Sequence, residues 1–235
     1  MTSTDVVVPR FLDRKPLIWT FTMLQTYDDV CPHQAWRRYI LRKGDEGHIP
    51  YAETPQMKRG NDVHSALEYR VTGNKPLPED MHDYERFARV FDGKKVRAEP
   101  RLAVNRKWEP TGYFDNDCWG RGRADIAIVE ETTAYLADWK TGNLRENPFE
   151  LEVQAVLIKA KFPRLQKIMG QFVWLKDGHI GRLHDLSDTA GTQARISDIV
   201  DKIEHDRSRN IFDKKKGPLC GWCDVRDCRH NTKPA

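Results

Sequence analysis

The chain has 235 residues, with 39 Lys or Arg, 35 Asp or Glu and a formal net charge of +4 at pH 7. This length suits one large domain, or one domain with an appended lobe. A charge so close to balance is weak support for a polyanionic partner, so a local basic patch matters more. No stretch resembles a membrane span, and residues 1–10 lack the features of a secretory signal. We therefore expect a cytoplasmic protein that does not enter a membrane.

Helical spacing of apolar residues dominates the first 95 residues. The segment 20–41 is predicted to be helical, with Thr20 as its cap and a break or restart at Pro32. A second helix is expected over 54–73, because a threonine cap is followed there by a first-turn proline. A third helix is expected over 79–91.

Three weaker signals connect these helices to the centre of the chain. His64 and Glu68 lie four apart on the second helix and share one face, for which an intrahelical hydrogen bond is the ordinary explanation. A strand is expected over 96–105, and it contains Glu99. The long polar and aromatic loop 106–121 has the length of a substrate-contacting loop, although a plain insertion is as common.

A hairpin is predicted at the centre of the chain. Two short apolar strands, 124–129 and 134–139, are separated by a polar segment of hairpin-loop length. Asp125 begins the first strand and Asp138 ends the second, so their carboxylates are expected at the same end of the ribbon. Side chains two apart on a strand share a face, so Lys140 points the same way as Asp138. Two acids and a lysine therefore converge.

A divalent cation is the partner that suits two converging carboxylates in an apolar setting. A structural Asp-Lys ion pair is the competing explanation. The Asp-x-Lys triplet alone does not decide between these explanations, because it occurs four times in the chain. Only the triplet at Asp138 ends an apolar strand and follows a strand with an embedded Asp. The other triplets begin at Asp13, Asp92 and Asp213.

The remaining pattern predicts an α/β fold. A helix over 148–161, with Gln154 near its middle, follows the hairpin. Strands 167–176 and 179–185 form a second hairpin around an Asp-Gly turn signal, and a last amphipathic helix runs over 188–206. This order indicates a small mixed sheet flanked by helices.

Three cysteines lie within nine residues near the C-terminus: Cys220, Cys223 and Cys228. Such spacing in a cytoplasmic protein is typical of metal ligands rather than disulfides. Four thiolates are the usual set for an iron-sulfur cluster or a structural zinc. Cys31 is the candidate for the fourth ligand. The competing candidates are Cys118 and, for zinc, His230 or His33.

Six short motifs occur in a fixed order along the chain. They read Tyr27-Asp-Asp-Val-Cys31-Pro32, Gly60-Asn-Asp-Val-His64-Ser-Ala-Leu-Glu68, Gly122-Arg-Ala-Asp125, Asp138-Trp-Lys140-Thr-Gly142, Gln154, and the closing Cys220, Cys223 and Cys228. Together they resemble the RecB-like branch of the PD-(D/E)XK nucleases. Within it, the chain is most similar to the iron-sulfur exonucleases of CRISPR adaptation, the nuclease domain of the AddB helicase-nuclease, and phage-encoded relatives.

The resemblance spans residues 27–228 and implies a restriction-endonuclease-like core. It implies a single nuclease domain over 1–235, composed of a helical part (20–95), a catalytic α/β core (96–186) and a C-terminal helix with the cysteine tail (187–235). A 4Fe-4S cluster on Cys31 and the three closing cysteines would join the N-terminal helices to this tail, with structural Zn²⁺ as the alternative.

The resemblance also implies site residues. Ligands for Mg²⁺ or Mn²⁺ would be His64, Asp125, Asp138 and the carbonyl of Trp139. Lys140 would orient or activate the attacking water and stabilise phosphate charge. Gln154 would open a Gln-x-x-x-Tyr motif, although Ile158 stands at the tyrosine position, and Glu99 matches an acidic position of some members. From their charge alone, contacts with the nucleic-acid backbone are expected from Arg123, Lys58, Arg59, Arg121 and the lysines 214–216, with solvated surface charge as the alternative.

The activity implied is a metal-dependent DNA exonuclease that acts on single- or double-stranded ends, with 5'→3' polarity suggested by the family alone. A partner protein from recombination or CRISPR adaptation is expected, and the oligomeric state is left open. One alternative is a structure-specific DNA endonuclease that uses the same site. The other is a non-cleaving DNA-binding subunit whose metal cluster is structural or redox-active, which would have no need of Asp125, Asp138 and Lys140 together.

Overall fold

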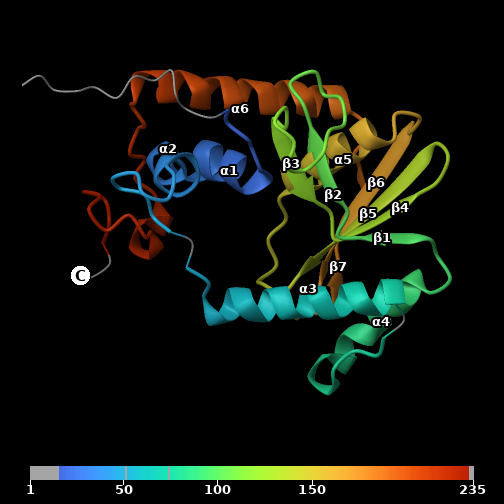
Figure 1. The fold of residues 1–235 in the computed structure, drawn as a ribbon. Coiled ribbons are helices and arrows are strands. Elements are labelled where there is room, and N and C mark those ends of the chain that lie inside the picture. Colours follow the sequence, from blue (N-terminus) through green and yellow to red (C-terminus); the bar gives the residue numbers. More distant parts are fainter. Residues whose placement is uncertain (1–15, 51, 74, 233–235) are drawn as a thin grey trace, which may run out of the picture.

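A six-stranded mixed sheet forms the centre of the structure, a computed structural model that describes residues 16–50, 52–73 and 75–232 (Figure 1). The strand order is β1-β4-β5-β6-β7, and β8 also pairs with β6. The strands are β1 (Val96–Ala98), β4 (Ile126–Val129), β5 (Thr133–Lys140), β6 (Lys167–Trp174), β7 (His179–Ile180) and β8 (His184–Asp185). Helices flank this sheet, so the predicted α/β class and mixed sheet are confirmed.

The central hairpin is formed by β4 and β5, as predicted. They pair antiparallel, with Ile126 opposite Ala137. Helix α5 (Pro148–Lys161) then carries the chain back, so β6 pairs parallel with β5. The side chain of Asn147 caps α5 by accepting a hydrogen bond from the Phe149 amide, which explains why the helix begins where the sequence predicts. Strand β5, which contains Asp138 and Lys140, is therefore hydrogen-bonded to a neighbouring strand on both edges.

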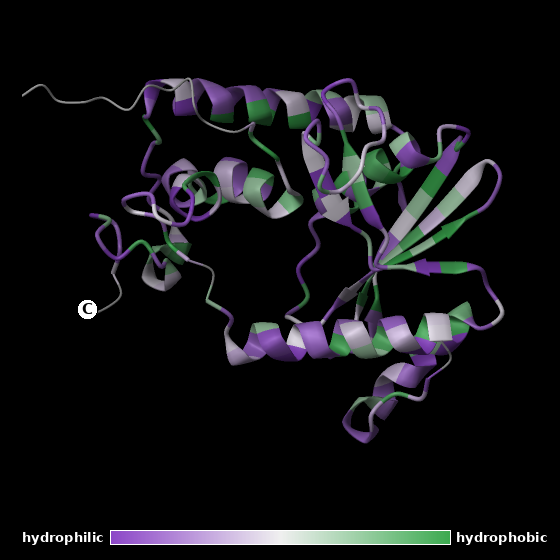
Figure 2. Cartoon of the chain, in the orientation of Figure 1, coloured by the Kyte–Doolittle hydropathy of each residue, from purple (hydrophilic) through white to green (hydrophobic). Residues whose placement is uncertain are grey.

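Alternating side chains of β5 pack into two hydrophobic cores on opposite faces of the sheet. Leu136 belongs to the core formed with α5 and α6 (Thr189–Arg209). Ala137 and Trp139 belong to the core formed with α3 (Pro55–Gly73). Apolar residues line the strands in Figure 2, while hydrophilic residues interrupt the helix surfaces. Burial of each large apolar side chain contributes about 1.5–3 kcal/mol, so both helix layers are held firmly on the strand.

The predicted N-terminal helix is present as four short, consecutive pieces. They are α1 (Phe21–Gln25), the π-helical η2 (Thr26–Val30), α2 (Pro32–Ala35) and the π-helical η3 (Trp36–Ile40). Thr20 caps α1 and the chain restarts at Pro32, as predicted. The Tyr27 hydroxyl donates a 2.6 Å hydrogen bond to Asp206, which ties this region to α6. None of the helices in the described ranges combines the length and apolarity needed to cross a bilayer.

The predicted strand over 96–105 is wrong in one respect. It divides at Glu99 and Pro100 into β1 and β2 (Arg101–Val104), and β2 pairs with β3 (Gly120–Arg123) in a separate two-stranded sheet. Pro100 has no backbone N–H for a ladder, and Glu99 adopts a left-handed φ of 43°. The chain therefore leaves one sheet and enters another at this point.

Three other predicted elements differ in their boundaries. The segment 79–91 is a succession of η4 (Glu79–Tyr84), α4 (Glu85–Ala88) and η5 (Arg89–Phe91), of which only α4 is α-helical. The segment 179–185 forms two short strands, β7 and β8, rather than one. The loop predicted over 106–121 ends earlier because its last two residues belong to β3.

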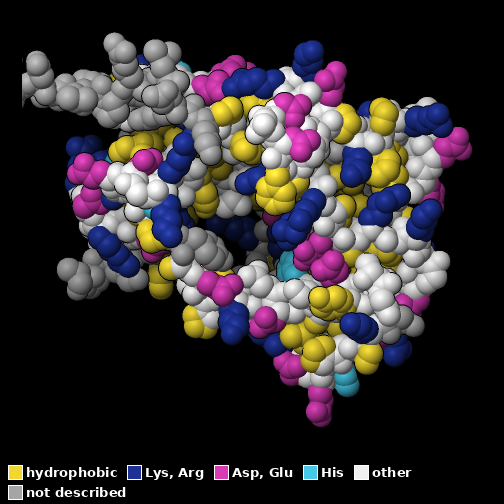
Figure 3. All heavy atoms as spheres, viewed as in Figure 1, with side chains coloured by type: hydrophobic (Ala, Val, Ile, Leu, Met, Phe, Trp, Pro, Cys, Tyr) yellow, Lys and Arg dark blue, Asp and Glu magenta, His cyan; other side chains and the backbone are white. Residues whose placement is uncertain are grey.

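The surface between the N-terminal helices and α3 is hollowed. Figure 3 shows this hollow near the middle of the face, with Lys and Arg side chains inside it. Below it, α3 runs across the sheet, and Gly60 in its second turn lies so near Thr141 that an added Cβ would be 3.2 Å from Oγ1. The start of α3 therefore lies beside the end of β5.

The far end of α3 is anchored by a buried arginine. Arg70 donates hydrogen bonds to Glu85, at 2.5 to 3.0 Å, and to Asp92, at 2.9 Å. These contacts to Arg70 lower the pKa of both carboxyl groups below their usual values. The network joins α3 to the segment 79–92, which covers the hydrophobic core on the α3 side of the sheet.

Arg70→Met is expected to lower the free energy of unfolding at pH 7 by about 2 kcal/mol, because hydrogen bonds between charged groups are lost. The folded-state pKa of Glu85 lies below its usual 4.5, so the pair stabilises the fold above pH 4.5 and is lost as the pH falls through the folded value. The difference between the two proteins should therefore shrink below pH 4.5. Urea unfolding at several pH values measures it.

Arg89→Met is the matched control, since Arg89 contacts the same Glu85 but is 71% exposed. Its effect should be close to zero. Equal effects of the two substitutions would contradict the anchoring role of Arg70.

Candidate functional site

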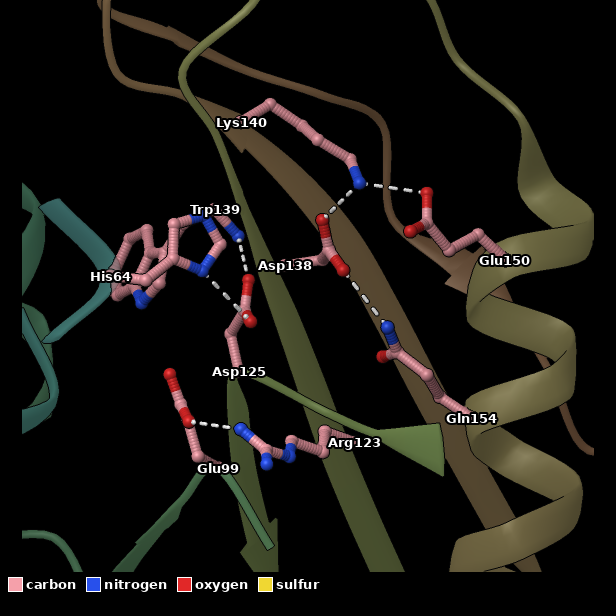
Figure 4. Close-up of polar contacts among 9 residues, drawn as sticks. All are labelled: His64, Glu99, Arg123, Asp125, Asp138, Trp139, Lys140, Glu150 and Gln154. Carbon is pink, nitrogen blue, oxygen red and sulfur yellow. Dashed lines mark hydrogen bonds and ion pairs between the residues drawn. The ribbon is translucent and has the colours of Figure 1, made fainter. Parts of the chain in front are cut away.

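The end of β5 places Asp138 and Lys140 together on the α5 side of the sheet. Lys140 Nζ lies 2.7 Å from Asp138 Oδ2, while Trp139 between them is buried in the opposite core (Figure 4). The predicted shared direction of Asp138 and Lys140 is therefore confirmed. Asp138 is only 4% exposed, so its charge is almost wholly removed from water.

Helix α5 contributes two side chains to this cluster from one face. Gln154 Nε2 donates a 2.9 Å hydrogen bond to Asp138 Oδ1. Glu150, one turn earlier, accepts a 2.7 Å hydrogen bond from Lys140 Nζ. Lys140 is thus held between two carboxylates, one from the strand and one from the helix. Ile158, four residues after Gln154, is fully buried in the core that α5 shares with α6.

Asp125 approaches from the bend that precedes β4. Its Oδ2 accepts a 2.7 Å hydrogen bond from the Trp139 amide, and its Oδ1 lies 3.1 Å from Nδ1 of His64. His64 comes from α3, whose Val63 packs in the same core as Trp139. In Figure 4, α3 and α5 approach the carboxylates from opposite sides of the strand. The structure therefore brings His64, Asp125, Asp138, Lys140 and Gln154 into one cluster.

The cluster carries an excess of buried negative charge. Burial, and then the charge of Asp125, raise the pKa of Asp138 to about 7, against the opposing effect of Lys140. Burial disfavours protonated His64, but its hydrogen bond to Asp125 and the nearby carboxylates outweigh burial and raise its pKa. Burial likewise opposes the charge on Lys140, yet Asp138 and Glu150 raise its pKa above the usual value. Lys140 stays protonated, and a further cation would relieve the carboxylates.

Glu99 and Arg123 lie at the border of this cluster. Arg123 Nη1 donates a 3.2 Å hydrogen bond to Glu99 Oε2, and the Glu99 amide donates to the Asp125 carbonyl. The left-handed backbone at Glu99 is costly for a residue with a side chain, and such outliers cluster at functional sites. Burial, and then the charge of Glu99, raise the pKa of nearby Glu68. A second acidic pair therefore lies next to Asp125.

Two acidic residues of this region were not among the predicted site residues. Glu150 precedes Gln154 by four residues, so their common helical face was the available signal. Glu68 follows His64 by four residues and gave the same signal, but its proximity to Glu99 depends on how α3 packs on the sheet. Neither contact can be inferred from local pattern alone.

A cavity of about 630 Å³ adjoins the cluster. Gln154 and Glu150 form one part of its lining, and Arg123 lies in the wall contributed by β3. The other two predicted nucleic-acid contacts, Lys58 and Arg59, are exposed in the first turns of α3. Arg59 pairs with Asp80 at 2.6 Å rather than with the acidic cluster.

The other Asp-x-Lys triplets have unrelated surroundings. Asp92 pairs with Arg70 at the far end of α3, and the carbonyl of Asp213 lies 3.8 Å from the Cys31 sulfur. Asp13 lies outside the residues that the structure describes. Of the three triplets that the structure describes, only the one at Asp138 is placed beside a second carboxylate in the core of the sheet, as the sequence predicts.

Four cysteines line a second cavity, of about 430 Å³, between α2 and the C-terminal tail. They are Cys31, Cys220, Cys223 and Cys228. Backbone amides point at two of the sulfurs, from Lys215 to Cys31 at 3.4 Å and from Gly217 to Cys220 at 3.3 Å. Amide donors of this kind stabilise thiolates, so the lining suits a thiolate-bound metal group.

The competing ligands are placed differently. Cys118 is buried beneath the loop before β3, where its thiol lies 3.8 Å from the Gly120 carbonyl. His33 also lines the cysteine cavity, whereas His230 is not among its lining residues. Across residues 16–50, 52–73 and 75–232, no three His, Cys, Asp or Glu side chains are already arranged as a set that could hold a metal ion.

Comparison with known proteins gives a likeness of fold only. No model of a known protein family matches the chain, and no curated protein matches it. A crystal structure described as that of a candidate exonuclease from Eubacterium rectale aligns with a TM-score of 0.53 and 11% identity, covering 100% of this chain and 96% of that one. The crystal structure of SSO0001 aligns with a TM-score of 0.49 and 14% identity, covering 94% and 89% of the two chains.

Asp138→Asn is expected to stabilise the metal-free protein at pH 8. Ionised Asp138 is costly in the folded state because its folded pKa, about 7, exceeds its ordinary 3.8. Wild-type stability from this group is therefore fully present below pH 3.8 and is lost as the pH rises through 7. The neutral variant should exceed wild type by about 1–3 kcal/mol at pH 8, and by less at pH 5. Urea unfolding in EDTA at both pH values measures this difference.

Asp201→Asn on the exposed face of α6 is the control and should leave stability unchanged. A variant at Asp138 that is less stable than wild type at pH 8 would show that the carboxylate serves the fold rather than a site.

Proposed function

We propose that this chain is a metal-dependent DNA exonuclease of the RecB-like branch of the PD-(D/E)XK superfamily, which hydrolyses phosphodiester bonds from DNA ends. The observation that carries the proposal is the convergence of Asp125, Asp138 and Lys140 at the end of β5. The cluster borders a cavity whose wall includes Arg123. The fold is also similar to that of a protein described as a candidate exonuclease, which agrees with the proposal without carrying it.

The residues of the cluster fit a divalent cation such as Mg²⁺ or Mn²⁺. Asp125 and Asp138 would hold the ion, with His64 and the Trp139 carbonyl as further ligands. The raised pKa of Asp138 supports this fit, since burial and then the charge of Asp125 outweigh the opposing effect of Lys140. When bound, the ion supplies phosphate neutralisation and an activated water for hydrolysis.

The protein side chains around the carboxylates have distinct roles in this proposal. Lys140 remains protonated and would place its positive charge beside the phosphate, where charge develops in the transition state. Glu150 positions Lys140 through the 2.7 Å contact, and Gln154 fixes the orientation of Asp138. Each of these contacts exists before substrate binds, so little reorganisation is needed.

We further propose that the cysteine cavity holds a 4Fe-4S cluster, with structural Zn²⁺ as the alternative. Four thiols line one cavity, and two of the sulfurs already face amide donors. A metal group there would join α2 to the tail, so it would hold together segments that are distant in sequence. Its role would be structural, because a different cavity adjoins the acidic cluster.

Cleavage of end-labelled DNA tests the nuclease proposal. Single- and double-stranded linear DNA and a closed circle are incubated with Mg²⁺, Mn²⁺ or EDTA. Only the linear substrates should shorten, only with metal, and the labelled end gives the polarity. Asp138→Asn and Lys140→Ala should each lower the rate by about 10²–10³-fold or more, since each removes charge stabilisation at the reacting phosphate. Asp201→Asn should cleave like wild type.

The alternatives give different products. Cleavage of the closed circle would indicate an endonuclease that uses the same residues. DNA binding with no metal-dependent product would contradict the enzyme and favour a DNA-binding subunit.

Purification under low oxygen tests the cluster. The protein should be yellow-brown and hold about four irons per chain. Cys223→Ser should lose both colour and iron, whereas Cys118→Ser should keep them, because Cys118 lies away from the cavity. Colourless protein with one zinc would replace the cluster with zinc, and full iron in Cys223→Ser would contradict the ligand set.

A further inference from the structure

An aromatic pair lies against two arginines in the loop between β2 and β3, with Tyr113 half-buried and Phe114 exposed. The rings of Tyr113 and Phe114 are 5.1 Å apart at 75°, and Phe114 is 74% exposed. The Arg121 guanidinium lies 4.9 Å from the Tyr113 ring centroid and 5.7 Å from that of Phe114. Arg101 lies 6.0 and 5.9 Å from the same two rings. We call these four residues the aromatic platform.

The loop does not need Phe114 for its own order. Asp115 accepts a 2.9 Å hydrogen bond from the Gly112 amide, and the Thr111 hydroxyl donates to Asp117 at 2.6 Å. Arg121 also donates to the Tyr113 carbonyl at 3.1 Å. Polar contacts thus set the loop conformation, while a large apolar ring is left in water at a cost in free energy. The Phe114 ring is therefore accessible to a ligand and packs beside a second ring, that of Tyr113.

The aromatic platform is connected to the acidic cluster by two adjoining cavities. Phe114 lines a cavity of about 390 Å³, and Tyr113 lines the 630 Å³ cavity beside the cluster. Tyr39 and Arg121 line both, so the two cavities meet at these side chains. The 630 Å³ cavity is also lined by Gln154, which is hydrogen-bonded to Asp138. The two adjoining cavities therefore mark a path from the exposed Phe114 ring to Gln154, beside the proposed reacting centre.

The lining of this path carries more positive than negative charge. Arginines outnumber acidic residues in the lining of both cavities. The 390 Å³ cavity is lined by Arg42, Arg121 and Arg207 with Asp115. The 630 Å³ cavity is lined by Arg38, Arg121 and Arg123 with Glu150. Guanidinium groups match phosphate geometry and also stack on planar rings. Charge and aromatic surface together match a nucleotide strand better than an apolar peptide.

We propose that the aromatic platform stacks unpaired bases of the DNA strand, whose backbone then follows Arg121 and Arg123 to the acidic cluster. Rings beside arginines are the usual means of holding single strands, because every base has a face that stacks. Bases of an intact duplex are already stacked on one another, so the platform selects unpaired ends. This inference rests on the proposed nuclease function and names the feature that would set its strand preference.

Binding without cleavage tests the proposal. Fluorescence anisotropy in EDTA is measured with a labelled oligo-dT, the same length of duplex, and an oligonucleotide whose bases are replaced by abasic sites. Phe114→Ala should weaken oligo-dT binding about tenfold and leave duplex binding unchanged. Phe114→Trp should restore it, because tryptophan also stacks. Wild type should bind the abasic strand more weakly than oligo-dT. On the abasic strand, Phe114→Ala should bind no more weakly than wild type, because no base is left to stack.

Tyr69→Ala is the matched control, since Tyr69 is also an exposed ring with a cation, Lys75, 4.9 Å from its centroid. Tyr69 lies near the far end of α3, so the Tyr69→Ala protein should bind oligo-dT like wild type. Three outcomes would overturn the proposal. The first is an equal loss of oligo-dT affinity in Tyr69→Ala and Phe114→Ala, and the second is an equal loss of affinity for duplex and single strand in Phe114→Ala. The third is no oligo-dT binding by wild type. Cleavage by wild type with normal binding by Phe114→Ala would overturn the platform alone. Stacking without any metal-dependent cleavage would keep the platform and overturn the nuclease.

Discussion

The buried carboxylate of Asp138 is the constraint around which the site is arranged. A charge this deep is tolerated only where partners offset it, and here the partners are Lys140 from the same strand and Gln154 from α5. These partners do not fully offset it, because burial, and then the nearby charge of Asp125, raise its pKa to about 7. Residual charge in a well-packed place is a mark of function rather than of stability.

The two hydrophobic cores explain how helices from distant parts of the chain reach this carboxylate. Leu136 and Trp139 project to opposite faces of β5, so α5 packs on one side and α3 on the other. Because α3 is fixed there, His64 lies at Asp125, and because α5 is fixed there, Glu150 lies at Lys140. The break at Glu99 then turns β2 and β3 away from the main sheet. Their loop carries the aromatic platform beside the same cavity.

Local patterns predicted the parts of this fold that depend on neighbours in sequence. Strand alternation predicted that Asp138 and Lys140 share a face, and the Thr20 capping signal predicted where α1 begins. The division at Pro100, the pairing of Glu150 with Lys140 and the gathering of Cys31 with the closing cysteines depend on long-range packing. A single sequence gives no physical signal for such contacts beyond residue type and order. The motif resemblance indicated the cysteine set, and the structure places those thiols around one cavity.

In the proposed enzyme, Asp125 and Asp138 together bind a divalent cation. Mn²⁺ binding to the DNA-free protein, followed by electron paramagnetic resonance as free Mn²⁺ is depleted, measures this property. Wild type should bind Mn²⁺, Asp138→Asn should lose that binding, and Asp201→Asn should retain it. Equal Mn²⁺ binding by wild type and Asp138→Asn, or none by wild type, would contradict the account.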